Sequence, residues 1–572
     1  MKWIFSFLKP LRKRITVGIS IKIIGTLAEL FIPFLLSYIL EHVIVTNEIS
    51  RILIYGGLMT LCAVAACLGN IIANRMAAKT TMIFSTRMRK ELFSKTLHLS
   101  ARSTDHFTIP SLESRITSDT YNVQNFIGMM QRMGIRAPIL LLGGSVITMI
   151  MDKKLALVMI ATLPFIFIIV YSISRMGVPL YSKVQQSVDG MVRVVREDAQ
   201  GIRVIKALSK IDYENARYDK ANRTLRQNEA KAGMIMGIVN PVMTLLMNIG
   251  IVAVVAAAAY FVAQGTSSAT TVIAFMQYFT LISMAMMTLS RMFVMYTKCA
   301  ASAKRIWQVM QEESELALRE DDGKGDADYH ISFEHVNFSY LGKENNIKDV
   351  SFRLKKGESL GIIGATGSGK STLLRLLMRF YDVNSGIIRI NGKDIRSYER
   401  SDLVKMFGIA FQNDFLYADT IEENIRFGRD ISSEEIVKAA KTAQAHDFIT
   451  SFAEGYSYGV TAGGTNLSGG QRQRLLISRA IAGNPEILIL DDSSSALDYK
   501  TDANLRQALS VDIPASTVIT VAQRVSSVKN CDLILVIEQG EIIGCGKHDQ
   551  LMQTCPEYKQ ISDSQMGGAF LD

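Results

Sequence analysis

Long apolar runs in the N-terminal half decide which folds are open to this chain. A helix needs about 20 apolar residues to cross roughly 30 Å of hydrocarbon. The candidate runs are 15–45, 52–76, 134–151, 155–175, 234–264 and 270–296. The remainder of the 572-residue chain reads as a soluble α/β protein. We therefore predict an all-α six-helix transmembrane domain over 1–310, a linker over 311–329 and a soluble α/β domain over 330–572.

Basic residues flank these runs unevenly. The short connections carry only Arg51, Lys153 and Lys154, whereas the long connections 77–133 and 176–233 carry many basic residues. Because positively charged connections remain in the cytoplasm, we expect the long connections and both termini there. The net charge of +10 is then explained by basic residues in the segments that flank the membrane spans. No basic stripe marks a recognition element, so no nucleic-acid partner is expected.

Cysteine spacing and the N-terminal stretch exclude two other classes. The six cysteines form no CxxC pair, so we expect reduced thiols and neither a disulfide framework nor a zinc site. The opening MKWIFSFLKPLRKR places its basic cluster after its apolar residues, the reverse of a cleavable signal. A short amphipathic helix on the cytoplasmic membrane face is expected instead.

The long connections have the pattern of helices. Segments 77–133 and 181–232 carry apolar residues at helical spacing, with Arg, Lys, Glu and Gln between them. The transmembrane helices are therefore predicted to continue into the cytoplasm. Each excursion needs a turn at its far end, and we place these turns at 103–111 and around Gly201.

Substrate candidates come from the first and last runs. Ionisable groups in a bilayer are costly and indicate function by default. Lys22 lies near enough to the cytoplasmic end to snorkel, so that interpretation and a transport role both stay open. Glu29 lies deeper and is expected to face a cavity, a partner helix or substrate. Met284 and Met287 belong to a methionine-rich run that suits varied ligands, with ordinary helix packing as the alternative.

The soluble half contains a phosphate-binding pattern. The apolar stretch 359–363 reads as a buried strand, and a Gly-rich loop and an apolar-periodic helix to Phe380 follow it. This order is the context that a P-loop requires, in which backbone N–H groups hold phosphates. Lys370 would reach the β/γ oxygens, and Ser371 would bind Mg²⁺. The predicted ATP-binding loop comprises Gly364, Thr366, Gly367, Ser368, Gly369, Lys370, Ser371 and Thr372.

Two further motifs lead to a family. The apolar run 487–490 ends at Asp491, the Walker B pattern with its acid on the Mg²⁺ side. Between the Walker elements, Leu467-Ser468-Gly469-Gly470-Gln471 opens the helical run RQRLLISRAIAG. LSGGQ followed by QR, together with the P-loop, resembles the signature of the ATP-binding cassette family. Six spans followed by a cassette is similar to the exporter branch in half-transporter form.

The resemblance implies a P-loop NTPase fold for 330–572, with ATP and Mg²⁺ as ligands, in a plasma (inner) membrane. It also implies that each nucleotide lies between the P-loop of one subunit and the signature of the other. Ser468, Gly469, Gly470 and Gln471 would therefore contact the partner's ATP. The cytoplasmic turns would be the family's coupling helices, which rest in grooves of the cassettes.

The resemblance assigns roles to three more positions. Tyr340 matches the aromatic residue that stacks on adenine, with an ordinary strand tyrosine as the alternative. Gln412 matches the glutamine that approaches Mg²⁺. The run Ser495-Ala496-Leu497-Asp498 matches the D-loop, which touches the opposite subunit.

Two positions depart from the family pattern. Asp492 stands where the family usually has glutamate, the general base, and its shorter side chain is expected to fall short of the attacking water. Gln523 stands where the family has its switch histidine, and an amide cannot become cationic. One departure alone is compatible with drift. Two departures at the same ATP site predict that this site binds ATP and hydrolyses it slowly.

The LSGGQ signature of this chain is intact, whereas the base and switch positions of its own ATP site are altered. A homodimer would contain two impaired sites, whereas a heterodimer would contain one impaired and one competent site. We therefore predict a subunit of a heterodimeric exporter, resembling bacterial multidrug exporters with one degenerate site. Its expected partners are a second half-transporter, the lipid bilayer and a small amphipathic drug or lipid-like substrate. An ATP-gated channel or regulatory subunit is the alternative, as is lipid, peptide or metal-chelate cargo.

Overall fold

The chain folds into a helical unit and a soluble unit. The computed structural model describes residues 2–264, 268–312, 316–340, 342, 344–412, 414–493 and 496–566. The helical unit comprises 1–98 and 107–312, and the soluble unit comprises 99–106 and 313–572. The segment 99–106 thus packs with the soluble unit although it lies between two halves of the helical one.

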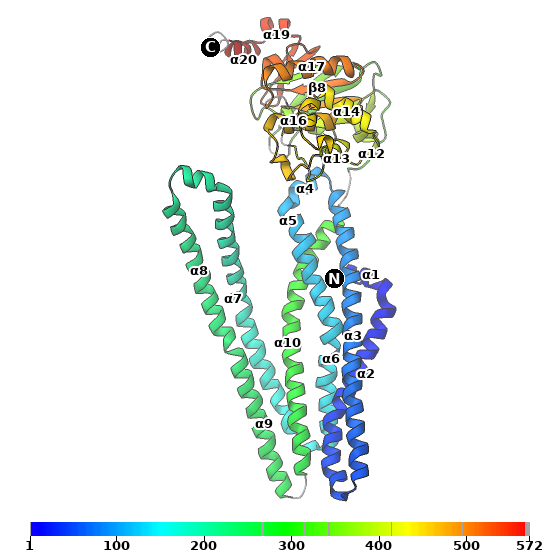
Figure 1. Cartoon of the computed structure of the whole chain (residues 1–572), viewed down its shortest axis with the longest axis vertical. Helices are drawn as coiled ribbons and strands as arrows, with labels where there is room; N and C mark the ends of the chain where they lie inside the picture. The colour runs from blue at the N-terminus through cyan, green and yellow to red at the C-terminus, as the bar shows by residue number, and fades with distance from the viewer. Residues whose placement is uncertain are drawn as a thin grey trace. The chain divides into compact units, whose positions relative to one another are not determined.

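Long helices build the helical unit (Figure 1). In chain order its helices are the short α1 (Lys2–Leu8), then α2 (Arg12–Tyr38), α3 (Ile49–Leu97), the short α5 (Ile109–Ser114), α6 (Thr120–Met151), α7 (Lys153–Ala207), α8 (Ile211–Gly237), α9 (Val239–Ala263) and α10 (Ala269–Gln311). Irregular helical turns join some of them: η1 (Lys9–Leu11), η2 (Ile39–Val43), η3 (Ile44–Thr46) and η4 (Arg115–Asp119).

Five helical stretches of the described residues are long and apolar enough to cross a membrane, namely 3–46, 49–97, 109–151, 244–263 and 270–311. The sixth predicted span, 155–175, lies within α7 and includes residues whose side chains are outside the described ones. At 1.5 Å per residue, α3 with 49 residues and α7 with 55 are about 74 and 83 Å long. Both exceed a hydrocarbon thickness of roughly 30 Å, as their extended periodicity predicts.

The predicted turn around Gly201 is wrong. Gly201 lies inside α7, which continues to Ala207, and the chain reverses at 208–210 before α8. Ser209 adopts a φ of +53° there. A glycine inside a helix costs only about 1 kcal/mol relative to alanine, and the surrounding helical sequence outweighs it. The other predicted turn, 103–111, contains most of α4 (Ala101–Phe107) and its junction with α5.

Two sheets organise the soluble unit. The first is antiparallel, in the order β2-β1-β4-β5, and the second has the order β10-β9-β3-β8-β7-β6 with a parallel centre. The strands are β1 (Ile331–Phe338), β2 (Ile347–Leu354), β3 (Ser359–Ile363), β4 (Ser385–Ile390), β5 (Lys393–Asp394), β6 (Phe407–Ala410), β7 (Ile487–Asp491), β8 (Thr517–Val521), β9 (Leu533–Glu538) and β10 (Glu541–Gly546).

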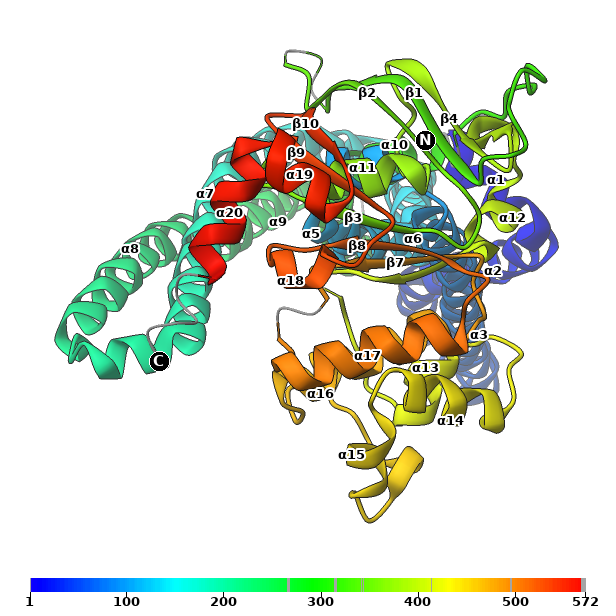
Figure 2. The same cartoon turned by 90° about the horizontal axis from the view of Figure 1, so that it is seen from above.

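Helices cover both faces of the larger sheet (Figure 2). The helices of the soluble unit are α11 (Lys370–Leu377), η5 (Ile395–Ser397), α12 (Arg400–Lys405), α13 (Ile421–Arg426), α14 (Ser433–Thr442), α15 (His446–Thr450), η6 (Gly455–Ser457), η7 (Ala462–Gly464), α16 (Gly469–Ile481), α17 (Tyr499–Asp512), α18 (Val525–Val528), α19 (His548–Thr554) and α20 (Pro556–Met566). One apolar core joins α11 to both sheets, and a second joins α13, α14, α16 and α17 to β6 and β7. β3, β8 and β7 are parallel neighbours, so their carboxyl ends meet at one edge.

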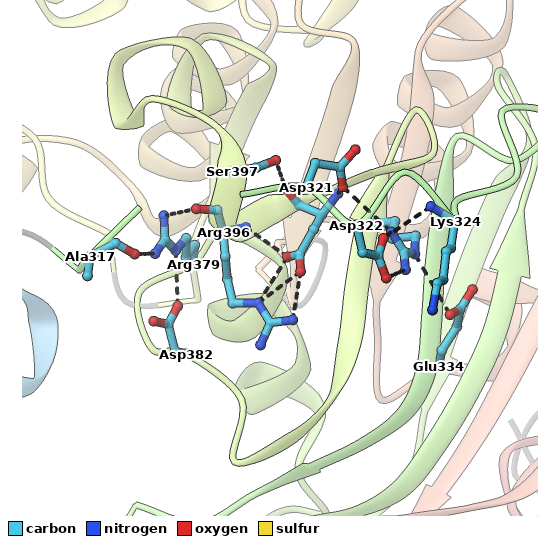
Figure 3. Close-up of polar contacts among 11 residues, drawn as sticks. Ala317, Asp321, Asp322, Lys324, Glu334, Arg379, Asp382, Arg396 and Ser397 are labelled. Atoms are coloured by element: carbon cyan, nitrogen blue, oxygen red, sulfur yellow. Dashed lines mark hydrogen bonds and ion pairs between the residues drawn. The ribbon is translucent and has the colours of Figure 1, made fainter. Parts of the chain in front are cut away.

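The described part of the predicted linker is bound to the soluble unit (Figure 3). Arg389 donates two hydrogen bonds to the carboxylate of Asp322, at 2.6 and 2.8 Å. Arg379 donates to the carbonyl of Ala317 at 2.6 Å, and the backbone N–H of Asp394 donates to Asp321 at 3.0 Å. This stretch is therefore held in place by charge-assisted hydrogen bonds.

Candidate nucleotide site

A pocket of about 320 Å³ opens at the shared edge of β3, β8 and β7. Ten of the predicted site residues line it: Thr366, Gly367, Gly369, Lys370, Ser371, Thr372, Gln412, Asp491, Asp492 and Gln523. They come from segments far apart in sequence, so the fold assembles one site from separate motifs. Its size falls in the range of small-molecule pockets.

The Gly-rich loop has the backbone that phosphate binding requires. Gly367 and Gly369 adopt φ values of +85° and +108°, which favour glycine. Lys370 begins α11 and donates from Nζ to the carbonyls of Gly364 and Ala365, at 2.9 and 2.8 Å. Burial lowers the pKa of Lys370, against the raising effect of two nearby aspartates. A cation held over a helix N-terminus and freed from water is well suited to bind phosphate oxygens.

Two predicted loop residues shape the loop without lining the pocket. A Cβ at Gly364 would lie 2.1 Å from the carbonyl oxygen of Ile537, so only glycine fits there. Ser368 is buried, and its hydroxyl has no hydrogen-bond partner within the described residues. The helix after the loop ends at Leu377, before the predicted end at Phe380. It stops because Arg379 has a φ of +53°.

Oxygen ligands suited to Mg²⁺ meet beside Lys370. The hydroxyl of Ser371 lies 3.5 Å from a carboxylate oxygen of Asp491. Burial raises the pKa of Asp491, and a bound cation would favour its charged form. The described residues contain no group of three His, Cys, Asp or Glu that could hold a metal alone. The donors therefore fit an ion that Ser371 and Asp491 hold together with nucleotide phosphates and water.

The two departures from the family pattern contact each other. Gln523 donates from Nε2 to Oδ2 of Asp492 at 2.9 Å. Gln412 donates from its own Nε2 to the same oxygen at 3.1 Å. Burial raises the pKa of Asp492, while Lys370 and the Gln523 hydrogen bond act in the opposite direction. Two amides thus engage the carboxylate oxygen that a general base would offer to water.

Tyr340 lies next to the pocket and is not one of the side chains that line it. Its ring packs edge-on against Tyr381 at 5.1 Å and against Phe338 at 4.8 Å. Its hydroxyl lies 3.4 Å from Oγ1 of Thr372. These contacts hold the ring beside the P-loop helix, and adenine stacking remains a prediction.

The signature turn is separate from this pocket. Ser468 caps α16, accepting from the N–H of Gln471 at 3.2 Å, while Gln471 accepts from the N–H of Ser468 at 2.9 Å. Ser468 and Gly469 are exposed. In the same way Asp498 caps α17 and accepts from the N–H of Thr501 at 2.9 Å. Ser495 of the predicted D-loop lies outside the described residues.

Six lining residues were not predicted, namely Asn345, Asn346, Val521, Ala522, Gln539 and Gly540. Gln539 and Gly540 have φ values of +47° and +85° in the two-residue turn between β9 and β10. A Cβ at Gly540 would lie 2.5 Å from the carbonyl oxygen of Asn346. The Gln-Gly pair between two apolar strands is a hairpin signal that could have marked this turn. Its position beside the P-loop could not be read from the sequence.

The substrate candidates lie in the helical unit and have different surroundings. Arg136 donates to both carboxylate oxygens of Glu29, at 2.5 and 3.2 Å. Lys22 is buried and donates to the side-chain oxygens of Asn70 and Asn74, at 2.6 and 3.1 Å. Amides of α3 therefore hold the Lys22 ammonium inside the helical unit.

A second pocket of about 70 Å³ lies between α6 and α10, and we term it the α6–α10 pocket. Its lining residues are Met133, Arg136, Ala137, Leu140, Leu281, Met284, Ala285 and Thr288. Met284 is therefore one of its walls. Met287 instead packs against the apolar core formed by α2, α6, α7, α9 and α10.

Family comparisons match both units. The family described as "ABC transporter transmembrane region" matches residues 15–286, and the family described as "ABC transporter" matches residues 347–495. An uncharacterized ABC transporter ATP-binding protein, YfiB of Bacillus subtilis (strain 168), is 34% identical over 570 residues, covering 99% of each chain. The putative multidrug export ATP-binding/permease protein YgaD of the same organism is 32% identical, covering 98% of each chain.

A solved structure shares the fold of the whole chain. It is the structure of a bacterial Atm1-family ABC exporter with ATP bound, with a TM-score of 0.84 and 24% sequence identity. The match covers 97% of this chain and 98% of the other. A helical transmembrane domain followed by a nucleotide-binding domain is therefore the fold, as the sequence predicts.

Proposed function

This chain belongs to the ABC transporters, and we propose that it is one subunit of a heterodimeric exporter whose own ATP site hydrolyses slowly. In this proposal the soluble unit and both termini are cytoplasmic and the helical unit spans the plasma (inner) membrane. The signature turn at Ser468 would complete a competent site with the P-loop of the partner subunit. The chain's own pocket would hold ATP and Mg²⁺ with little turnover.

The observation that carries this proposal is the environment of Asp492. A general base must reach the proton that it removes, and such catalysis contributes about 10²–10⁴ in rate. Here Gln412 and Gln523 both donate to Oδ2 of Asp492. An amide hydrogen bond stabilises the carboxylate and occupies a lone pair, so it opposes the rise in pKa that burial causes and takes the place of a water at this oxygen. The shorter aspartate side chain adds to the same effect.

The intact signature turn supports a division of labour between subunits. Ser468 is exposed and its turn is ordered by reciprocal capping, outside the pocket of its own chain. The N-terminus of α16 would supply further donors to phosphate oxygens of a second nucleotide. As cargo we propose amphipathic drugs or lipid-like molecules, because the relative YgaD is named a putative multidrug export protein and Met284 lines a pocket between helices.

The test compares ATP hydrolysis by the reconstituted chain alone and together with a co-expressed six-span ABC partner. Asp492→Asn is expected to leave the turnover of the pair nearly unchanged, since the competent site uses the partner's base. Ser468→Arg, which blocks the signature turn, is expected to lower it by about 10²-fold or more, because the competent site then lacks its donors.

The control is Ser433→Arg, an exposed position at the start of α14 that should have no effect. Robust turnover by the isolated chain at the rate of the pair would contradict the heterodimer. Loss of the pair's turnover in Asp492→Asn would contradict the slow site. An electrical current without ATP-driven uptake would contradict the export function and would indicate a channel.

A further inference from the structure

The C-terminal helix α20 contacts the backbone at the switch position, Gln523. Gln565 of α20 donates from Nε2 to the carbonyl of Gln523 at 2.8 Å. The backbone N–H of Val525 donates to Oε1 of the same side chain, also at 2.8 Å. These two residues lie 42 and 40 positions before Gln565 in the chain. One side-chain amide therefore uses its donor and its acceptor to bridge the backbone across Arg524.

The two backbone groups that Gln565 binds belong to a junction between a strand and a helix. Ala522 follows β8, and its N–H donates to the carbonyl of Ile362 at 3.1 Å. α18 begins at Val525, and the N–H of the first residue of a helix has no partner within that helix. In the described structure, Arg524 makes no side-chain hydrogen bond that caps α18. Gln565 therefore supplies from α20 the cap that the local sequence lacks.

Apolar packing fixes α20 beside this junction. Tyr558 of α20 is fully buried and shares one apolar core with Ala522 and Val525. Ile561, one turn further along α20, packs against the same core. Gln565 is one more turn along, so helical spacing places it on the face that carries Tyr558 and Ile561. Because the helix is already held, ordering Gln565 costs only the conformational entropy of one side chain.

Gln523 connects this contact to the general-base position. Its side chain donates from Nε2 to Oδ2 of Asp492 at 2.9 Å. The backbone N–H of Asp492 donates to the carbonyl of Val521 at 2.9 Å, so the sheet holds the backbone of Asp492 independently of α20. Gln565 itself lies outside the lining of the nucleotide pocket. It therefore reaches Asp492 through the backbone and the side chain of Gln523.

Resting on the proposed slow site, we infer that Gln565 is a positioning residue that keeps the Gln523 amide on Asp492 and so keeps hydrolysis at this chain's own site slow. A Gln523 whose backbone is not held can adopt rotamers in which its amide leaves Oδ2 of Asp492. A water can then occupy that oxygen. The slow turnover of the site thus depends on a contact from the C-terminal helix as well as on the two altered residues.

The test begins with Gln565→Met, which keeps the length of the side chain and removes both hydrogen bonds. Single-turnover ATP hydrolysis is measured in the reconstituted pair with the partner's P-loop disabled, so that only this chain's own site hydrolyses ATP. The rate is expected to increase by about fivefold, the factor that one net hydrogen bond represents. Gln560→Met, at an exposed glutamine of the same helix, is the matched control and should keep the wild-type rate.

A double-mutant cycle shows whether Gln565 acts through Gln523. Gln523→Ala alone should also increase the rate, and adding Gln565→Met should then have no further effect, because the amide that Gln565 positions is absent. Gln565→Glu separates the two hydrogen bonds, since its carboxylate can accept from Val525 but cannot donate to Gln523. This variant should hydrolyse ATP at the rate of Gln565→Met while amide exchange at Val525 stays slow.

Hydrogen–deuterium exchange checks the contact itself, and exchange within 523–526 should become about tenfold faster in Gln565→Met. An unchanged or slower rate of hydrolysis in Gln565→Met would overturn the inference, as would additive effects of Gln565→Met and Gln523→Ala. Failure of the proposed function has a different signature, which is seen in the wild type. In that case this chain's own site hydrolyses ATP as fast as the partner's site, whatever the Gln565 variants do.

Discussion

The hydroxyl of Tyr381 donates a hydrogen bond to the carboxylate of Asp105, and so joins α4 to the core of the soluble unit. Burial and the neighbouring Asp105 raise the pKa of Tyr381, so the phenol remains a proton donor at physiological pH. The Tyr381 ring also packs edge-on against Tyr340 beside the nucleotide pocket. A single side chain therefore contacts both the segment that returns to the membrane helices and Tyr340, which lies next to the nucleotide pocket.

Tyr381→Phe should weaken the coupling of ATP turnover to transport. The substitution removes one charge-assisted hydrogen bond and keeps the ring, so ATP affinity should change less than about twofold. Transport per ATP hydrolysed should fall by about fivefold in the reconstituted pair. Tyr398→Phe, which removes a phenol bonded to the carbonyl of Ile390 at 2.9 Å, is the matched control. An unchanged transport ratio in Tyr381→Phe would show that the α4 contact is only structural.

Asp492→Glu combined with Gln523→His should increase ATP hydrolysis at this chain's own site. The longer carboxylate reaches further toward the attacking water, and the Gln523 donor to Oδ2 is removed. Since a well-placed base contributes about 10²–10⁴, we expect a gain of at least about tenfold. The measurement is single-turnover hydrolysis in a pair whose partner P-loop is disabled. If the double variant stays at the starting rate, residues beyond these two limit the site.

Arg389→Ala should loosen the linker. The Arg389 side chain is almost fully buried, at 3% exposure, and its two hydrogen bonds hold Asp322. The Arg389 guanidinium holds the pKa of Asp322 well below its usual range, so the pair persists at any neutral pH. Limited proteolysis within 316–324 should become about tenfold faster, because a charged hydrogen-bonded pair is lost. The control is Arg353→Ala, which changes a more exposed arginine on β2. This variant should be cleaved at the rate of the wild type.

Stability of the soluble unit should fall on mild acidification, in part through His330. This side chain is buried, with Nδ1 2.6 Å from Oγ1 of Thr517. Burial lowers its pKa despite Glu486, so the folded state binds the proton less readily than the unfolded state. Its contribution is therefore complete above an unfolded pKa of about 6.5 and declines as the pH falls below that value.

The measurement for His330 is the thermal midpoint of the full chain's soluble unit between pH 7.5 and about 5. His330→Gln should flatten this pH dependence. His335→Gln is the control, because His335 is exposed and pairs with Asp349 at the surface. An equal slope in His330→Gln and wild type would assign the acid sensitivity to other groups.

Apolar runs and glycine positions in the sequence were sufficient to predict much of the fold. The predicted strands at 359–363 and 487–491 match β3 and β7, because a buried parallel strand needs an apolar run of that length. The P-loop follows from glycines whose backbone angles other residues rarely adopt. The turn after α7 was misplaced, since glycine in a long helical pattern does not by itself end a helix.

Which side chains meet was decided by tertiary structure. Glu29 and Arg136 are 107 residues apart, and Asp105 and Tyr381 are 276 apart. The sequence alone identified Asp492 and Gln523 as unusual, yet only the neighbouring carboxyl ends of β7 and β8 bring the amide to the carboxylate. Periodicity and glycine placement act over a few residues and can be read directly. Pairing between distant residues depends on how helices and strands pack, and the sequence does not display that packing.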